Sequence, residues 1–365
     1  MKNLFLQIAL LCMIITIPYY SQIKNSKKDI NPQEGIFATL VTNKGEIILN
    51  LDYEHVPMTV ANFIGLAEGK IKNDAFSENI PFFNGSIWHR VVSGHVIQAG
   101  MPNMGKEMES PGYEFPNEIF TGLSHNKAGM LGMANAGPNT NGSEFYITLG
   151  DRSYLDGNYT LFGHVIRGME TVFNIVQGDT IKSIQIKRVG KKANNFIVTS
   201  DSFFQMVKEA KTKLIADEDK RVKEEVEIIQ KNWPDAVTTA TGLKYNVNSE
   251  GSGSIPEKGA VLKVQYEGSF LLSGYKFYST ANEGKPDNTN SPEEFDYITG
   301  STNINPGINE MISVMKPGEI RTVIIPSNMA YGMSAYYSKE IKGKKRFVIS
   351  PNTTLIYKIT VFGIK

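Results

Sequence analysis

One permanent cation and one neutral amide stand near apolar residues in the segment Trp88 to Gly100, which reads W-H-R-V-V-S-G-H-V-I-Q-A-G. They are Arg90, whose guanidinium stays charged and offers five donors, and the amide Gln98. Valines and isoleucines on both sides of Ser93-Gly94 predict two short strands joined by a tight turn. Residues two apart in a strand point to one face, so Arg90, Val96 and Gln98 can lie together. The pattern favours a site that stabilises charge with a fixed cation. It does not favour acid-base chemistry.

A second stretch combines strands with a run of small and turn-forming residues. Gly129 to Thr148 reads G-M-L-G-M-A-N-A-G-P-N-T-N-G-S-E-F-Y-I-T, and the motifs Y-L-D-G from Tyr154 and F-G-H-V from Phe162 follow in order. In these motifs and their spacing, the chain from Ile36 to Gly190 resembles the cyclophilin family of peptidyl-prolyl cis/trans isomerases. The resemblance implies a mainly β domain over 36–190, built as a closed antiparallel barrel capped by helices.

The resemblance also implies a reaction. Rotation about an X-Pro bond faces a barrier of about 18–20 kcal/mol because the amide is conjugated. The transition state is a twisted amide whose nitrogen has regained its lone pair, so a donor aimed at that nitrogen lowers the barrier. The family's catalytic arginine matches Arg90, Gln98 would hold a substrate carbonyl, and the backbone of Asn135 would bind the peptide as an added strand. The positions implied for the proline slot and its rim are His95, Val96, Ala134, Glu144, Tyr146, Tyr154, Leu155 and Tyr159.

Six of these positions differ from the residues usual in the family. The chain has His95 where the family usually has phenylalanine, Val96 in place of methionine, Glu144 in place of glutamine, Tyr146 in place of phenylalanine, Tyr154 in place of tryptophan and Tyr159 in place of histidine. We expect His95 to matter most, because a smaller polar ring packs a proline less tightly and titrates near neutral pH. We expect Tyr154 to affect inhibition by cyclosporin and not isomerase activity.

The periodicity of the chain predicts the elements that hold this site. Apolar residues alternate around Asn43-Lys44-Gly45 over 36–51, which is typical of a β-hairpin. Apolar residues at helical spacing predict helices over 59–68 and 169–177. The polar loop over 73–81 is longer than usual in the family, and it is either a surface insertion or a segment that alters access to the groove.

Between the two halves of the chain the composition shifts to lysine, glutamate and aspartate. Apolar residues from Phe203 onward recur at intervals of four and three, which predicts an amphipathic helix over 201–233 that ends before Pro234. We assign 191–238 to a charged helical linker. The helix is either a solvated spacer packed on a neighbouring domain or the seam of a homodimer.

From Ala260 the apolar period changes to two, which predicts a second β domain. Its motifs are V-Q-Y-E-G-S-F from Val264, A-Y-G from Ala330 and P-N-T-T-L-I-Y from Pro351, and in their order the chain resembles the FKBP family from Thr241 to Lys365. The resemblance implies an α+β domain with an antiparallel sheet over 239–365. It also implies the same reaction, in an aromatic pocket that desolvates the twisted amide. The positions implied for this pocket are Tyr266, Phe277, Phe295, Ile304, Ile308, Tyr331, Ile349 and Tyr357.

Three positions of the second domain depart from the family pattern. Tyr278 replaces the aspartate usual in the family, Asn305 replaces an isoleucine, and Ile308 replaces the tryptophan of the pocket floor. The segments 280–292 and 332–350 are also longer than usual. We therefore expect weak isomerase activity or none from this domain, with peptide binding retained.

With 365 residues, of which 41% are hydrophobic and 21% charged, the chain is long enough for two ordinary domains. Its formal net charge of +1 does not favour a polyanion such as nucleic acid as a partner. Lys2 and an apolar run over 4–17 predict a secretory signal over 1–21, cleaved near Ser21 and followed by a polar tether over 22–35. An uncleaved N-terminal anchor is the alternative. Cleavage would leave no membrane span, and export would place the protein in a bacterial periplasm or cell envelope.

Neither half of the sequence contains a nucleotide-binding loop, a metal cluster or a nucleophile triad. His55, His89, His125 and His164 are scattered without ligand spacing, so we interpret them as structural and expect no metal and no cofactor. Cys12 is the one cysteine and lies in the predicted signal, which leaves the mature chain without a thiol.

The sequence leaves three functions open. The first is an exported foldase that isomerises prolyl bonds in unfolded or nascent protein clients, mainly with the cyclophilin-like domain. The second is a non-catalytic chaperone that holds such clients with both pockets and the helix over 201–233. The third is a scaffold for one dedicated partner. The residues around Arg90 favour the enzyme.

Overall fold

The computed structural model describes residues 34–102, 110–279, 295–300, 304–333, 336–337 and 348–365. The predicted signal over 1–21 and nearly all of the tether over 22–35 lie outside the described residues. So do the segment 280–292 and most of the central part of 332–350. Among the helices of the described residues, none is both long and apolar enough to cross a membrane.

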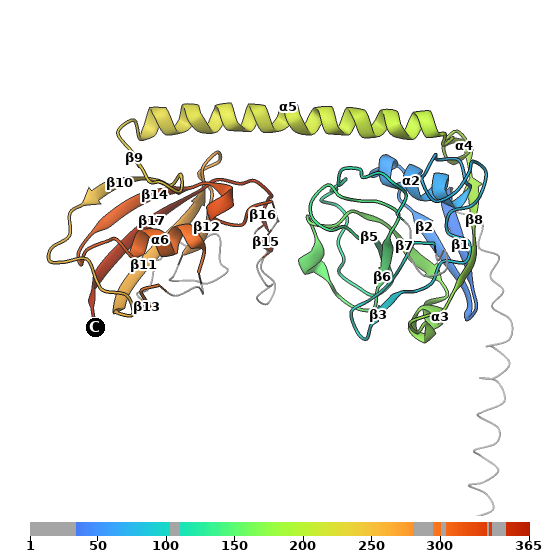
Figure 1. Cartoon of the computed structure of the whole chain (residues 1–365), viewed down its shortest axis with the longest axis horizontal. Helices are drawn as coiled ribbons and strands as arrows, with labels where there is room; N and C mark the ends of the chain where they lie inside the picture. The colour runs from blue at the N-terminus through green and yellow to red at the C-terminus, as the bar shows by residue number, and fades with distance from the viewer. Residues whose placement is uncertain (1–33, 103–109, 280–294, 301–303, 334–335, 338–347) are drawn as a thin grey trace, which may run out of the picture. The chain divides into compact units, whose positions relative to one another are not determined.

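The first sheet contains eight strands in the order β3-β4-β6-β5-β7-β2-β1-β8 (Figure 1). This path ends at β3 and β8, so the predicted closed barrel is wrong and the sheet is curled but open. The reason is that β3 has three residues, and the segment before it approaches β8 through scattered contacts instead of a ladder. These contacts include the isolated bridge between Ile87 and Thr180 and the bond from Trp88 N to Asp179 O at 2.8 Å. The strands are β1 (Gly35–Thr42), β2 (Gly45–Leu51), β3 (Arg90–Val92), β4 (Val96–Ala99), β5 (Met130–Met133), β6 (Phe145–Thr148), β7 (Leu161–Arg167) and β8 (Ile181–Val189).

The local elements predicted for the first domain form, except that the helix predicted over 169–177 ends at Asn174, since Ile175 is extended. The hairpin over 36–51 is β1 and β2, with Thr42 paired to Gly45 across the turn. The helix predicted over 59–68 is α2, and the carboxylate of Glu118 caps its first turn by accepting from the backbone N–H of Thr59 at 2.6 Å. Two strands over 129–148, joined by the asparagine-rich run, are β5 and β6. The remaining elements of this part are α2 (Pro57–Ala67), η1 (Ser153–Leu155), α3 (Met169–Asn174) and α4 (Lys191–Asn194).

The helix predicted over 201–233 is α5 (Ser200–Asn232). Near its start, Phe203 is fully buried, and its ring centroid lies 5.4 Å from that of Tyr113 and 5.8 Å from that of Phe115. Farther along the helix, the apolar residues Leu214, Ile215, Val222 and Val226 are exposed. The first turns of α5 therefore complete the core of the first domain. A homodimer through the rest of the helix stays a prediction.

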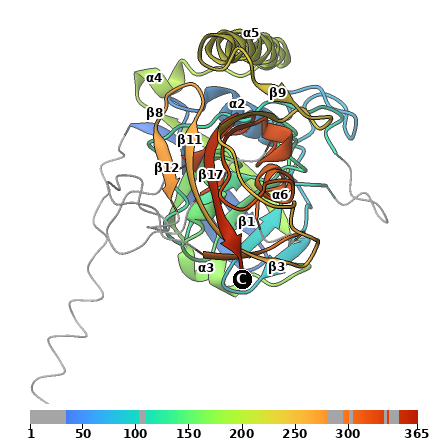
Figure 2. The same ribbon diagram turned by 90° about the vertical axis from the view of Figure 1, so that its left-hand side faces the viewer.

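The C-terminal part of the chain forms a second antiparallel sheet in the order β12-β11-β17-β14-β10-β9, with β13 also paired to β11. The helix α6 (Pro306–Ile312) packs against β14 and β17 (Figures 1 and 2). This packing needs a glycine at 307, because a Cβ there would lie 2.4 Å from a methyl carbon of Ile325. Bounds in this part are β9 (Val237–Thr238), β10 (Lys244–Ser249), β11 (Val261–Phe270), β12 (Lys276–Ser279), β13 (Phe295–Ile298), β14 (Ile320–Ile325), η2 (Ser327–Met329), β15 (Tyr336–Tyr337), β16 (Val348–Ile349) and β17 (Leu355–Ile364).

If the first turns of α5 belong to the first core, Phe203→Ala should lower its free energy of unfolding by about 3–5 kcal/mol, the usual cost of truncating a buried phenylalanine. Urea unfolding of the full chain, followed by the fluorescence of the buried Trp88 in a Trp233→Phe background, measures this change. Ile215→Ala, at a side chain that is 65% exposed on the same helix, is the matched control and should change stability by about 0.5 kcal/mol or less. Equal effects of the two substitutions would contradict the assignment.

Candidate functional site

The register of three neighbouring strands places the predicted polar residues on one face. Gln98 on β4 lies directly opposite Arg90 on β3 and directly opposite Tyr146 on β6. Directly paired residues of an antiparallel ladder have close Cβ atoms on the same face, so the side chains meet. Arg90 Nη1 donates to Gln98 Oε1 at 3.2 Å, and Gln98 Nε2 donates to Glu144 Oε2 at 2.7 Å. The exposed cation is thus joined to a half-buried carboxylate through one amide.

Glu144 closes this polar chain and is also 3.1 Å from His89 Nε2. Burial by itself would raise the pKa of the Glu144 carboxyl. The hydrogen bonds from His89 and Gln98, together with the charge of His89, outweigh burial and lower that pKa. The carboxylate is therefore ionised at neutral pH and acts as a fixed acceptor. It orients the amide of Gln98 so that the amide oxygen faces Arg90.

The apolar positions predicted for the slot surround the same ladder. Val96 and Tyr146 are buried, and Ala134, Leu155 and Tyr159 are half-buried. The rings of Tyr146 and Tyr159 meet edge to face with centroids 6.0 Å apart.

Two of the predicted departures, His95 and Tyr154, contact each other at the rim. Their rings are stacked with centroids 6.2 Å apart, and Tyr154 Oη lies 3.3 Å from His95 Nδ1. The residues that replace two apolar rings of the family are therefore paired with each other.

A cavity of about 680 Å³ opens beside the polar chain. Among the predicted residues it is lined by Gln98, Ala134, Asn135 and Glu144. Arg90 and the slot positions 96, 146, 155 and 159 are outside its lining. The sequence did not predict that Lys211, from the linker helix α5, would also line it.

The loop that carries Asn135 is held by its own polar groups. Asn135 Nδ2 donates to the carbonyl of Asn158 at 3.0 Å, and Asn135 Oδ1 accepts from Gly137 N at 3.3 Å. Ala134 N donates to the carbonyl of Glu144 at 2.9 Å. This bond joins the start of the loop to the residue that precedes β6. The side chain of Asn135 therefore helps to hold the loop in place.

Seven of the eight positions predicted for the second pocket come together in one cluster around β11, β17 and α6. Tyr266, Phe277, Ile308, Ile349 and Tyr357 are buried in it, and Ile304 and Tyr331 pack against it. The backbone of Phe295 lies in β13, and its side chain is outside the described part. Asn305, one of the departures, serves as the N-cap of α6 by accepting from Gly307 N at 2.9 Å.

His125, interpreted from the sequence as structural, is buried beside the slot with a partner at each ring nitrogen. His125 Nε2 lies 2.8 Å from Tyr146 Oη, and His125 Nδ1 lies 2.6 Å from Asp156 Oδ1. The signal that could have found it is the tyrosine at 146, because a buried hydroxyl needs a partner. In the parts of the chain that are described, no group of three or more His, Cys, Asp or Glu residues is placed to hold a metal ion.

Comparison with known proteins finds matches to both halves of the chain. Residues 37–191 match the family model of cyclophilin type peptidyl-prolyl cis-trans isomerases, and residues 253–362 match that of FKBP-type peptidyl-prolyl cis-trans isomerases. A probable peptidyl-prolyl cis-trans isomerase A of Mycobacterium leprae is 46% identical over 132 residues, which are 35% of this chain and 72% of that protein. Peptidyl-prolyl cis-trans isomerase B of Streptomyces anulatus is 41% identical over 136 residues, 36% of this chain and 77% of that protein. A crystal structure of a cyclophilin type isomerase of Cryptosporidium parvum is 28% identical, with a TM-score of 0.36 over 43% of this chain and 100% of that one.

The two family models and these relatives define a peptidyl-prolyl cis-trans isomerase. The chain belongs to the cyclophilin family through its first domain, and it carries an FKBP-type domain after the linker helix.

The environment of His95 predicts a pH dependence. Burial, and then the positive charges of Arg152 and Arg90, lower the pKa of His95 below its ordinary value of 6.5. The His95 ring is therefore neutral at pH 7 and becomes a cation only in more acidic solution. A cation at this position would lie beside the slot predicted to hold the apolar proline ring. We expect kcat/KM on a short X-Pro peptide to be level from about pH 8 to 7 and to fall on acidification.

The matched variant is His95→Phe, which removes the titrating group and restores the apolar ring usual in the family. Its pH profile should lack the acid-side fall. A fall of equal size in the variant would assign the titration to another group.

Proposed function

We propose that the cyclophilin domain supplies most of the isomerase activity and that Arg90 is its catalytic residue. The observation that carries the proposal is the chain from Arg90 through Gln98 to Glu144, with an apolar slot on the same face. In this reaction the planar amide of an X-Pro bond twists, and its nitrogen regains a lone pair. Arg90 donates toward that nitrogen, which stabilises the twisted state more than the planar one. No proton changes place, which suits a side chain that cannot act as an acid or base.

The neighbouring residues divide the remaining work. Gln98 binds a substrate carbonyl, and the backbone of Asn135 binds the peptide as a short added strand. The residues His95, Val96, Ala134, Tyr146, Tyr154, Leu155 and Tyr159 form the slot and its rim, and Glu144 fixes the amide of Gln98.

For the FKBP-type domain we propose peptide binding with weak isomerase activity or none. The cluster around Tyr266 and Tyr357 supports an aromatic pocket, with ring centroids 5.8 Å apart. Ile308 offers less apolar surface than the tryptophan usual at that position, and it is 2% exposed at the start of α6. The pocket therefore holds a proline less tightly.

Replacement of Arg90 tests the main proposal. In the full chain, Arg90→Ala should lower kcat/KM for cis/trans exchange of an X-Pro peptide by roughly a hundredfold, the usual cost of losing one donor to a transition state. Arg167→Ala is the matched control, because Arg167 is an exposed arginine on β7 of the same sheet, and it should keep full activity. If Arg90→Ala stays active while Tyr357→Leu loses activity, the working pocket is in the second domain.

The clients we propose are unfolded or nascent proteins that contain proline. A non-catalytic chaperone that uses both pockets is the second candidate, supported by the exposed apolar residues of α5, such as Ile215 and Val226. The Arg90→Ala variant separates the two functions. If it still suppresses aggregation of an unfolded protein but no longer speeds its proline-limited refolding, both functions are present.

We also propose export to a bacterial periplasm or cell envelope, on the strength of Lys2 and the apolar run over 4–17. The intact mass of the protein recovered from the cell envelope should correspond to a chain that begins near residue 22. A full-length mass in the membrane fraction would instead support an uncleaved anchor.

A further inference from the structure

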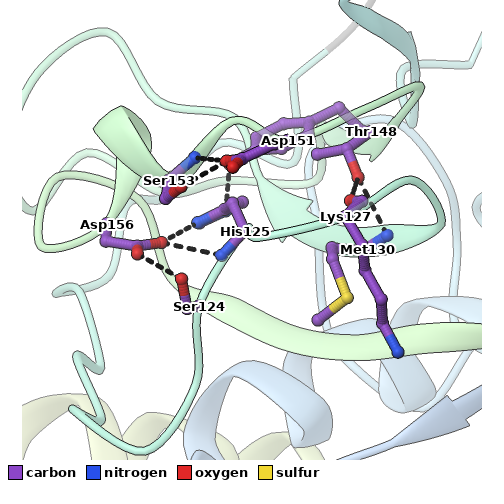
Figure 3. A network of polar contacts seen from close by, with 9 residues as sticks. Ser124, His125, Lys127, Met130, Thr148, Asp151, Ser153 and Asp156 are labelled. Atoms are coloured by element: carbon purple, nitrogen blue, oxygen red, sulfur yellow. Dashed lines mark hydrogen bonds and ion pairs between the residues drawn. The ribbon is translucent and has the colours of Figure 1, made fainter. Parts of the chain in front are cut away.

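His125 lies between the proline slot and the loop that carries Tyr154 and Leu155. Its side chain is 1% exposed, and its carbonyl accepts from Arg152 N at 2.6 Å. Figure 3 shows its ring directed toward Asp156. On the other side, Nε2 lies 2.8 Å from the hydroxyl of Tyr146.

The partners of Asp156 determine which ring nitrogen of His125 carries hydrogen. The carboxylate accepts from His125 N at 2.8 Å and from Ser124 Oγ at 2.6 Å, and it faces His125 Nδ1 at 2.6 Å (Figure 3). An ionised carboxylate only accepts hydrogen bonds, so Nδ1 must be the donor. In the neutral ring Nε2 is then an acceptor, and its lone pair points at Tyr146.

The hydroxyl of Tyr146 is the last member of the hydrogen-bonded chain from Asp156 through His125. Burial, and then the charges of Tyr159, Asp156 and Tyr154, raise the pKa of Tyr146 well above its ordinary value. The hydroxyl therefore keeps its proton and donates a hydrogen bond to Nε2 of His125. Each polar atom of this buried chain has a partner of the right kind, which avoids the cost of an unsatisfied group.

Tyr146 is held at its backbone as well as at its hydroxyl. Tyr146 pairs in register with Gln98 on one side and with Gly132 on the other. A Cβ at position 132 would lie 2.5 Å from Tyr146 Cζ and Oη, so the ring rests over a strand position without a side chain. With the edge of Tyr159 beside it, the ring has its direction set by the bond to His125.

We propose that His125 is a positioning residue for the isomerase reaction and acts by holding the Tyr146 ring, through its hydroxyl, as the wall of the proline slot. The inference rests on the proposal that the cyclophilin domain is the catalyst. A phenylalanine at 146 would have no hydroxyl to hold, so the role belongs to the tyrosine of this chain. His125 does not touch the substrate, and its effect passes entirely through Tyr146.

A double-mutant cycle in the full chain tests this proposal. His125→Asn keeps a side-chain donor for Asp156 but removes the acceptor for Tyr146, and it should lower kcat/KM on an X-Pro peptide by about tenfold. In a Tyr146→Phe background the same substitution should change kcat/KM by less than about twofold, because the bond it removes is already absent. His125→Gln brings an amide oxygen to the place of Nε2 and should recover most of the loss.

A spectroscopic readout separates positioning from support of the fold. The 15N signal of His125 Nε2 should be that of an unprotonated, hydrogen-bonded nitrogen, should shift on Tyr146→Phe, and should shift again when the X-Pro peptide saturates the wild-type chain. Equal losses from His125→Asn in both backgrounds, or a protonated Nε2, would overturn the proposal. If Arg90→Ala proves fully active, the catalyst is elsewhere and the proposed function fails, whatever the cycle gives.

Discussion

The backbone register of β3, β4, β6 and β5 is the constraint on which the first site depends. Arg90, Gln98, Tyr146 and Gly132 are paired in turn across four strands, so the side chains of the first three occupy one face at fixed spacing. A slip of one residue in any pair would move a member of this row to the opposite face. The geometry of the row from Arg90 to Tyr146 is thus held by ladder hydrogen bonds. Such rigidity suits a reaction in which the enzyme contributes only position and charge.

The departures from the family pattern are coupled to one another in the structure. Tyr146 gains a hydroxyl, and a buried histidine accepts its hydrogen bond. His95 and Tyr154 replace two apolar rings and stack on each other. Glu144 replaces an amide and takes donors from both sides. A polar change at each of these four positions is therefore matched by a polar partner, which offsets the cost of placing polar groups in the site.

Much of this could be predicted from the sequence, because it depends on local patterns. Alternation of apolar residues gave the hairpin over 36–51, and four-three spacing with Pro234 gave α5. Contacts between distant segments could not be predicted in the same way. The open edge of the first sheet depends on how few residues β3 pairs, and the place of Lys211 at the cavity depends on how α5 packs through Phe203. Periodicity identifies a helix face but not the surface that covers it.

The central claim is that peptide binds and isomerises on the first sheet. NMR of the full chain with a short X-Pro peptide tests it directly, because amides at the working pocket shift and broaden at the rate of cis/trans exchange. The account predicts that these changes appear at Gln98, Ala134 and Leu155, with smaller shifts and no exchange broadening in the second domain. Exchange broadening confined to residues around Tyr266 and Tyr357 would contradict it.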